Sequence, residues 1–126
     1  MRLINYGLGE ITDRLSILSL KKLFGEQAGR DITHWRNEQN ALLVQTRNRT
    51  LNLELSLELA AVNAALWHKE DELRSYRIQE RTLVLSQLTA AIVSCAFRIQ
   101  ELNDQRASLV HKINEAAGDT SASDKV

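Results

Sequence analysis

Residues 85–113 have the sequence LSQLTAAIVSCAFRIQELNDQRASLVHKI, and this stretch decides the fold. Nine of its positions follow one another at intervals of three and four residues, and eight of the nine are apolar: Leu85, Leu88, Ile92, Cys95, Ile99, Leu102, Arg106, Leu109 and Ile113. This spacing predicts an amphipathic α-helix with a seam of coiled-coil type. We expect the helix to begin near Thr82 and to end before Gly118, since glycine favours the C′ position.

Residues that break helices are rare elsewhere in the chain. Its 126 residues include no proline and five glycines, and the 88 residues between Gly29 and Gly118 contain neither. Sandwiches and barrels of β-strands need turn residues about every dozen positions, so both classes are excluded. An apolar content of 44% is ordinary for a globular core. The sequence therefore predicts a single all-α domain over residues 1–118, followed by a small polar tail at 119–126 that we expect to be disordered.

Three further helical segments are expected before the seam. The first should run from about Glu10 to Phe24 and stop at Gly25. Asp31 or Thr33 can cap the second segment. The third should span residues 50–76, and it is either separate from the second or continuous with it, because the polar stretch 46–50 does not force a break. The prediction is an antiparallel helical bundle of four helical segments.

Leucines at every second position from Leu51 to Leu59 fit a β-strand when they are taken alone. They merge, however, into apolar positions at helical spacing that continue to Leu73, and the alanines among them are strong helix formers. A lone strand would also have no partner in this chain. We therefore predict a helix here.

Charge and cysteine content narrow the possible functions. Sixteen basic and sixteen acidic residues cancel, so no overall field draws the chain to nucleic acid or to an anionic membrane. Arg30, Arg36, Arg47 and Arg49 give a mildly basic stretch that indicates a solvated face, with a phosphate-binding patch as the alternative. Cys95, the only cysteine, occupies a seam position, which predicts a small buried side chain and a reducing compartment. With no signal peptide and no long apolar run, we expect a soluble cytoplasmic protein that binds no nucleic acid and does not insert into a membrane.

Polar residues interrupt the apolar stripes of three helices, and the simplest interpretation is structural. Glu70 and Arg74, for example, form a favourable i,i+4 pair. A metal site is the alternative, because Glu10 with Asp13 has the Glu-x-x-Asp spacing that binds Mg²⁺ beside phosphate oxygens in helical pyrophosphohydrolases. Glu101 and Asp104 repeat this spacing, and a helical dimer that holds a dicarboxylate with arginines, as in chorismate mutase, also fits the size. No histidine or cysteine spacing indicates zinc, and we expect no cofactor.

Three stretches, GEITDRLSIL at 9–18, NAALWHKEDELR at 63–74 and LNDQRASLVHKIN at 102–114, together resemble an uncharacterised family of short bacterial helical proteins. The resemblance covers residues 9–117 and departs from the family pattern at 75–82, where relatives often carry a Gly-containing loop. Members are often encoded among glycosyltransferase and surface-polysaccharide genes, which implies a cytoplasmic accessory role in making lipopolysaccharide or capsule. The motif positions form a candidate functional or structural polar cluster: Glu10, Asp13, Arg14, Asn63, Trp67, Glu70, Asp71, Arg74, Asn103, Asp104 and Arg106.

The function favoured at this point is a non-enzymatic accessory, scaffold or binding protein in bacterial surface-glycan assembly, with a possible protein partner there. The alternative is a small helical enzyme that uses acidic residues and a divalent metal on a phosphorylated or nucleotide-sugar substrate. The carboxylates of Glu10, Asp13 and Asp104 discriminate between the two. An enzyme requires them to converge on a solvent-open pocket, whereas a binding protein leaves them scattered or sealed against arginines.

Two structural predictions follow from the seam. It is about 42 Å long, and the shorter first helix covers only part of it, so we expect a second copy to cover the exposed flank in a homodimer. Arg106 needs a carboxylate partner, because an unpaired guanidinium in an apolar seam is costly. With a hairpin turn near Gln79, Glu70 would lie about 27 Å away along the helices. We therefore predict that Arg106 pairs with Glu10 or Asp13 of the same chain.

Overall fold

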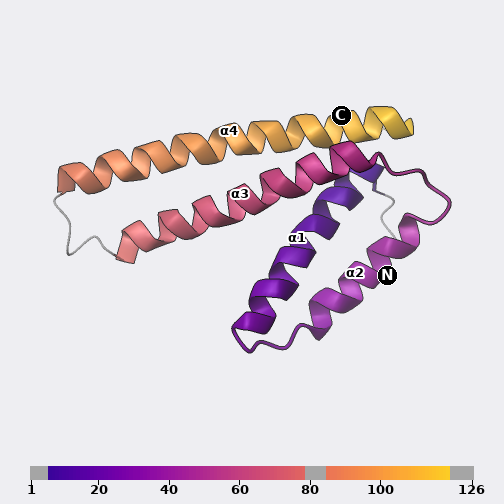
Figure 1. Ribbon diagram of the computed structural model, residues 1–126, viewed down its shortest axis with the longest axis horizontal. Helices are drawn as coiled ribbons and strands as arrows, with labels where there is room; N and C mark the ends of the chain where they lie inside the picture. Colours follow the sequence, from indigo (N-terminus) through magenta and orange to yellow (C-terminus); the bar gives the residue numbers. More distant parts are fainter. Residues whose placement is uncertain (1–5, 79–84, 120–126) are drawn as a thin grey trace.

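The computed structural model describes residues 6–78 and 85–119, and it consists of helices joined by short loops (Figure 1). The helices are α1 (Leu8–Gln27), α2 (Thr33–Gln45), α3 (Leu53–Ile78) and α4 (Leu85–Ala117), with no strand over the described ranges. The prediction of an all-α helical bundle is confirmed. The predicted turn near Gln79, the expected helix start at Thr82 and the tail at 120–126 lie outside the described residues.

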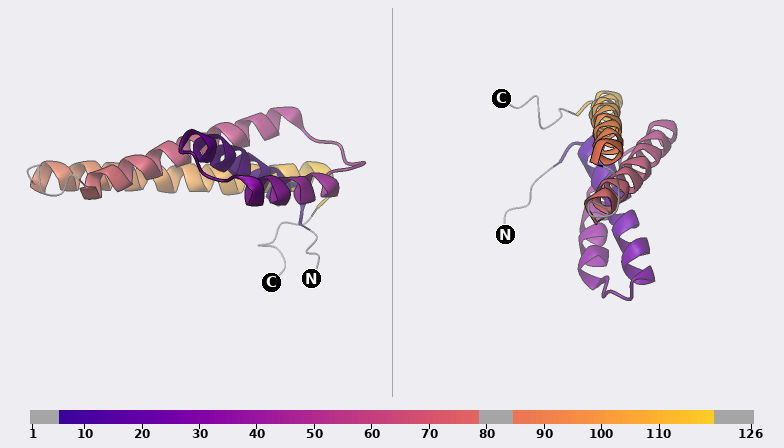
Figure 2. Two further views of the ribbon diagram at one scale, coloured as in Figure 1. Left: turned by 90° about the horizontal axis from the view of Figure 1, so that it is seen from below. Right: turned by 90° about the vertical axis from the view of Figure 1, so that its left-hand side faces the viewer.

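Helices α3 and α4 form a long antiparallel hairpin, and α1 crosses it obliquely while α2 runs back beside α1 (Figures 1 and 2). Helix α1 contacts all three other helices and therefore buries two faces. Leu8 packs with Leu59 of α3 and with α4 residues at the open end of the hairpin, whereas Ile11 and Leu18 pack against Leu42 of α2. These two small cores hold the pair α1–α2 on one half of the hairpin.

The predicted seam of α4 faces α3 along the hairpin. Every seam residue whose side chain is described is buried or half-buried: Leu88, Ile92, Cys95, Ile99, Leu102, Arg106, Leu109 and Ile113. The Cys95 thiol donates a hydrogen bond to the backbone oxygen of Lys69 at 3.2 Å, so these two residues lie level with each other.

Helix α1 does not stop at Gly25 as predicted, because this glycine is a packing residue inside the helix. A Cβ atom at Gly25 would lie 2.5 Å from Cζ3 of Trp35, so only glycine lets α2 approach this closely. The helix ends at Gln27, and Gly29 two residues later adopts φ 71°. The N–H groups of Gly29 and Arg30 bond to the oxygens of Glu26 and Gly25, as in a Schellman motif.

Helices α2 and α3 are separate, so the alternative of one continuous helix is wrong. Asn48 adopts φ 65°, a left-handed conformation that asparagine tolerates better than most residues. The Asn52 side-chain oxygen then accepts the Leu55 N–H at 3.0 Å and caps α3. Two asparagines therefore supply the break that neither glycine nor proline provides.

The chain leaves α4 through Gly118, which has φ 74° and confirms the predicted C′ position. Asp119, which the sequence assigns to the disordered tail, belongs to the packed fold. Its carboxylate accepts the Leu8 N–H at the start of α1, at 2.9 Å, and forms an ion pair with Arg49 of the α2–α3 loop. Asp119 therefore joins both ends of the fold to the α2–α3 loop.

Candidate functional site

The carboxylate of Asp13 on α1 lies at the crossing of three helices. Arg106 of α4 donates two hydrogen bonds to it, from Nε to Oδ1 at 2.8 Å and from a terminal nitrogen to Oδ2 at 2.5 Å. Asn63 of α3 donates a third, at 2.9 Å. The predicted pairing of Arg106 with Glu10 or Asp13 is confirmed, with Asp13 as the partner. We call the trio Asp13, Asn63 and Arg106 the helix lock.

The charges of the helix lock compensate each other. The Asp13 side chain is 11% exposed and that of Arg106 is 34% exposed, so the pair is partly shielded from water. Hydrogen bonding to Asp13 raises the pKa of Arg106, and the negative charge of Glu70 adds to this effect. Glu70 therefore acts on Arg106 through space without bonding to it.

A second polar contact ties the first turn of α1 to the last turns of α4. Asn114 is a buried residue, with 1% of its surface exposed. Its side-chain oxygen accepts a hydrogen bond from the Gly9 N–H at 2.7 Å, and its side-chain nitrogen donates one to Glu10 at 2.9 Å. A Cβ at Gly9 would lie 2.3 Å from the backbone oxygen of Val110. Gly9 is therefore required for the close approach of α1 to α4.

Most of the other predicted site residues have exposed side chains. Asn103, Asp104 and Glu70 are exposed. Arg74 pairs with Asp71 rather than with Glu70, so the predicted i,i+4 pair is wrong and an i,i+3 pair replaces it. Arg14 lies 4.5 Å from the ring centroid of Tyr6 and 3.9 Å from Glu38.

The two hollows that adjoin on α1 differ in charge. One, of about 450 Å³, is lined by Glu10 and by the ion pairs Asp13–Arg106 and Arg14–Glu38. The other, of about 490 Å³, lies between the end of α1, the start of α2 and the middle of α3. Lys21 borders both. We call the second hollow the aromatic groove; it is lined by Lys21, Phe24, Gly25, Ala28, Arg30, Trp35, Trp67, Asp71 and Arg74.

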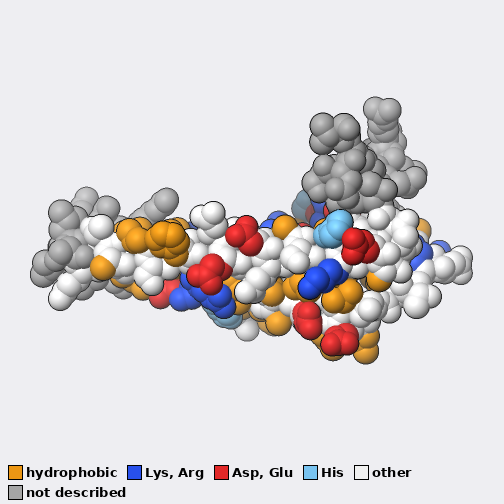
Figure 3. Space-filling model, turned by 90° about the horizontal axis from the view of Figure 1, so that it is seen from above, with side chains coloured by type: hydrophobic (Ala, Val, Ile, Leu, Met, Phe, Trp, Pro, Cys, Tyr) orange, Lys and Arg blue, Asp and Glu red, His pale blue; other side chains and the backbone are white. Residues whose placement is uncertain are grey.

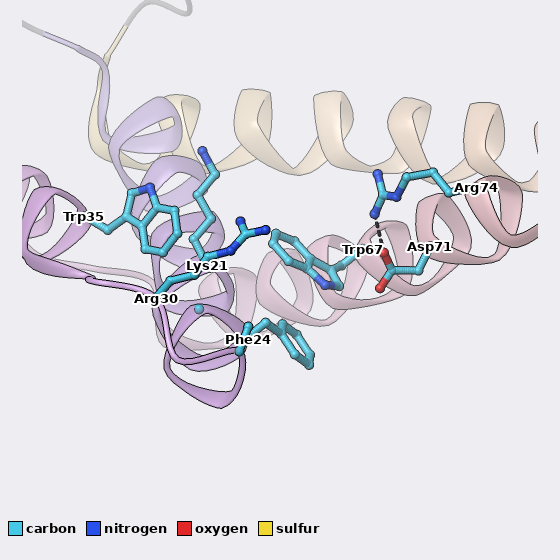
Figure 4. Close-up of a pocket in the computed structure, with 9 residues that line it drawn as sticks. Lys21, Phe24, Arg30, Trp35, Trp67, Asp71 and Arg74 are labelled. Carbon is cyan, nitrogen blue, oxygen red and sulfur yellow. Dashed lines mark hydrogen bonds and ion pairs between the residues drawn. The ribbon is translucent and has the colours of Figure 1, made fainter. Parts of the chain in front are cut away.

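The rings of the aromatic groove come from three helices. Phe24 stacks on Trp67 with ring centroids 5.3 Å apart and planes inclined by 14°. Trp35 packs on Gly25 across the α1–α2 loop. Both tryptophans are half-buried, so they anchor the helices and still border the hollow. Figure 4 shows Arg30 reaching between the two indoles and Lys21 running past them to end above both rings in this view, while Arg74 turns back to Asp71.

Cys95 is buried, as predicted, and is not activated as a nucleophile. Burial raises the pKa of its thiol, and the negative charge of Glu72 raises it further. Glu72 itself accepts hydrogen bonds from Lys69 at 2.9 Å and from Tyr76 at 2.8 Å, and these lower its pKa. The cluster stabilises the hairpin beyond α1.

The acidic residues that an enzyme requires do not converge. Glu10 and Asp13 border the same hollow, but Asp13 is bonded to Arg106 and Asp104 is exposed outside that hollow. Within residues 6–78 and 85–119, no group of three histidine, cysteine or acidic side chains is arranged to hold a metal ion. The three carboxylates of Glu10, Asp13 and Asp104 are therefore not gathered in one hollow.

Several important residues escaped the sequence analysis. Asn114 follows the seam residue Ile113 directly, and a polar residue in this position could have indicated a buried side chain with hydrogen-bond partners on another helix. Lys21, Phe24 and Arg30 carry no pattern that connects them with Trp67, because their approach depends on how α1 crosses α3.

No protein-family model, no curated protein and no solved structure matches the chain. The resemblance to the uncharacterised bacterial family therefore stays a prediction. Among the described helices, none combines the length and apolar character needed to cross a membrane.

Proposed function

We propose that this protein is a non-enzymatic accessory and binding protein of bacterial surface-glycan assembly, acting in the cytoplasm. The observation that carries the proposal is that the motif residues Asn63 and Arg106 both donate hydrogen bonds to the motif residue Asp13. Side chains whose hydrogen-bonding groups are paired with one another fix the helices together, and they are not available for acid–base chemistry.

The second support is the contrast between the helix lock and the aromatic groove. The lock fixes α1 on the hairpin, and the groove that this creates is lined by half-buried rings and exposed cations. Three motif residues, Trp67, Asp71 and Arg74, line it. A rigid scaffold that presents such a groove suits recognition of a ligand or a partner.

The test is deletion of the gene in its bacterial host, followed by gel analysis of surface polysaccharide and rescue by plasmid-encoded variants. We expect deletion to shorten or reduce the polysaccharide and the wild-type gene to restore it. Glu10→Gln and Asp104→Asn should restore it equally well, because neither carboxylate needs its charge in a binding protein. An unchanged polysaccharide after deletion contradicts the assembly role, and failure of both conservative variants favours the enzyme.

Self-association is part of this proposal, although the seam itself is covered by α3. The outer face of α4 carries Val93, 48% exposed, and Phe97, 66% exposed, one turn apart and beyond the region that α1 covers. Figure 3 shows apolar side chains gathered on this half of the hairpin. Exposed large apolar groups at adjacent turns favour burial against another surface, and we propose a second copy as the partner.

Light scattering at micromolar concentration tests the dimer. We expect twice the mass of one chain for the wild type and the mass of one chain for Phe97→Glu. Leu53→Glu is the matched control, because Leu53 is 70% exposed at the other end of the hairpin. A wild-type monomer, or a dimer that Leu53→Glu dissociates while Phe97→Glu does not, contradicts the proposed surface.

A further inference from the structure

The aromatic groove concentrates the chain's rings and leaves cations beside them without a counter-charge. It contains both tryptophans of the chain and one of its two phenylalanines. Three basic side chains and one acidic side chain line it. Arg74 pairs with Asp71, but no hydrogen bond or ion pair of the Lys21 or Arg30 side chain occurs within the described part of the chain.

Two cations of the neighbouring hollow differ from Lys21 and Arg30 in having partners. This hollow is lined by as many acidic as basic side chains, and two of its cations already have anionic partners, since Arg106 pairs with Asp13 and Arg14 with Glu38. Two cations that lie in one hollow without a counter-charge create a positive potential that favours an anion from solution. The aromatic groove is therefore the better anion site of the two.

The chemistry of the groove specifies more than an anion. A guanidinium binds phosphate oxygens through two parallel hydrogen bonds, and an ammonium adds a compact charge. Indole faces stack on flat rings, including nucleobases and sugar rings, with little dependence on the exact ring. A hollow of about 490 Å³ is within the usual size range of small-ligand sites.

We infer that the aromatic groove binds a phosphate ester carried on a ring, with the phosphate on Arg30 and Lys21 and the ring against Trp35 or Trp67. Nucleoside phosphates and sugar phosphates share this chemistry. The inference rests on the proposed binding role and names its ligand class. It does not require any reaction at the phosphate.

Isothermal titration calorimetry on the full chain tests the inference with five probes: uridine 5′-monophosphate, glucose 1-phosphate, inorganic phosphate, uridine and glucose. At least one ring-bearing phosphate should bind at least about tenfold more tightly than inorganic phosphate and than its own uncharged ring compound, since both parts of the site contribute. Tighter binding of the first probe identifies the nucleoside phosphate, and tighter binding of the second identifies the sugar phosphate.

Variants locate the binding in the groove. Arg30→Gln and Lys21→Gln should each weaken the better probe by about tenfold, because each removes one charge from the phosphate. Arg47→Gln is the control, since Arg47 is exposed on the α2–α3 loop and does not line the groove. Circular dichroism checks that all three variants unfold at the wild-type midpoint. Tryptophan fluorescence, excited at a wavelength where the probes do not absorb, should change on binding because both indoles border the groove.

Failure of both ring phosphates to bind at millimolar concentration overturns the inference, as does inorganic phosphate binding equally tightly. Equal losses in Arg30→Gln and Arg47→Gln overturn the location. These results are independent of the polysaccharide test, so a failed titration with an intact deletion phenotype rejects the ligand class and leaves the proposed function in place.

Discussion

Replacement of Arg106 by methionine tests the helix lock most quantitatively. Methionine keeps most of the apolar stem but removes two of the three hydrogen bonds to Asp13, leaving this carboxylate with Asn63 alone. Breaking a fully buried ion pair costs about 3–5 kcal/mol. Since Arg106 is 34% exposed, solvent screening reduces the expected loss to about 2 kcal/mol. For a domain of this size, that loss corresponds to a fall of about 8 °C in Tm.

Urea denaturation followed by circular dichroism measures the effect, with an unchanged slope as evidence that only the stability differs. Arg98→Met is the matched control, because Arg98 lies on the same helix and pairs with Glu101 at 3.3 Å on the exposed surface. It should change stability by about 0.5 kcal/mol or less. Arg106→Ala should be less stable than Arg106→Met, since it also loses the packing of the stem.

A double variant completes the test. Adding Asp13→Asn to Arg106→Met removes the charge that the first change leaves unpaired, so the double variant should be more stable than Arg106→Met alone. Equal destabilisation by Arg106→Met and Arg98→Met, or a further loss in the double variant equal to that of Asp13→Asn alone, would refute the reasoning.

Three further predictions concern the backbone and the thiol. Gly9→Ala should destabilise the protein by about 2–3 kcal/mol, seen in the urea midpoint, because its Cβ would lie 2.3 Å from the Val110 oxygen; a gain in stability, as expected for alanine in an isolated helix, would contradict the close approach. Asn48→Gly should raise the stability by about 0.5 kcal/mol in the same assay, because glycine adopts positive φ at no steric cost, and a loss would show that the asparagine side chain has a role of its own. Cys95 should be alkylated by iodoacetamide at pH 8 far more slowly in the folded protein than in urea, as mass spectrometry can measure. Equal alkylation rates in the folded and the urea-unfolded protein would contradict the burial of Cys95. Because the pKa of the Cys95 thiol is raised in the fold, the stability that the neutral thiol contributes should be lost as pH rises above the ordinary thiol pKa.

The all-α fold could be predicted from local sequence patterns, but the ends of the helices could be predicted only in part. The spacing from Leu88 to Ile113 requires a helix whatever its neighbours are, and Gly118 ends it by its own conformational freedom. The role of Gly25 could not be predicted, because it depends on Trp35, which lies ten residues further along the chain and on a different helix. From sequence alone, a glycine inside a helix that lets another helix pack closely cannot be distinguished from a glycine that ends the helix.

The candidate site divides in the same way. The partner of Arg106 was predictable, because a guanidinium in an apolar seam requires a carboxylate and few carboxylates were within reach along the helices. The aromatic groove was not predictable. It depends on the angle at which α1 crosses α3, which brings Arg30 and Lys21 to Trp67, and residue spacing along single helices does not determine that angle.

The central claim is that the motif residues of the helix lock maintain the fold while the aromatic groove performs the function. The most direct test is rescue of the deletion strain at low temperature by Arg106→Met and by Arg30→Gln, with the amount of folded protein measured for each. We predict that Arg106→Met restores the surface polysaccharide in proportion to its folded amount, and that Arg30→Gln fails at wild-type abundance. Full rescue by Arg30→Gln, with no rescue by abundant folded Arg106→Met, would contradict the account.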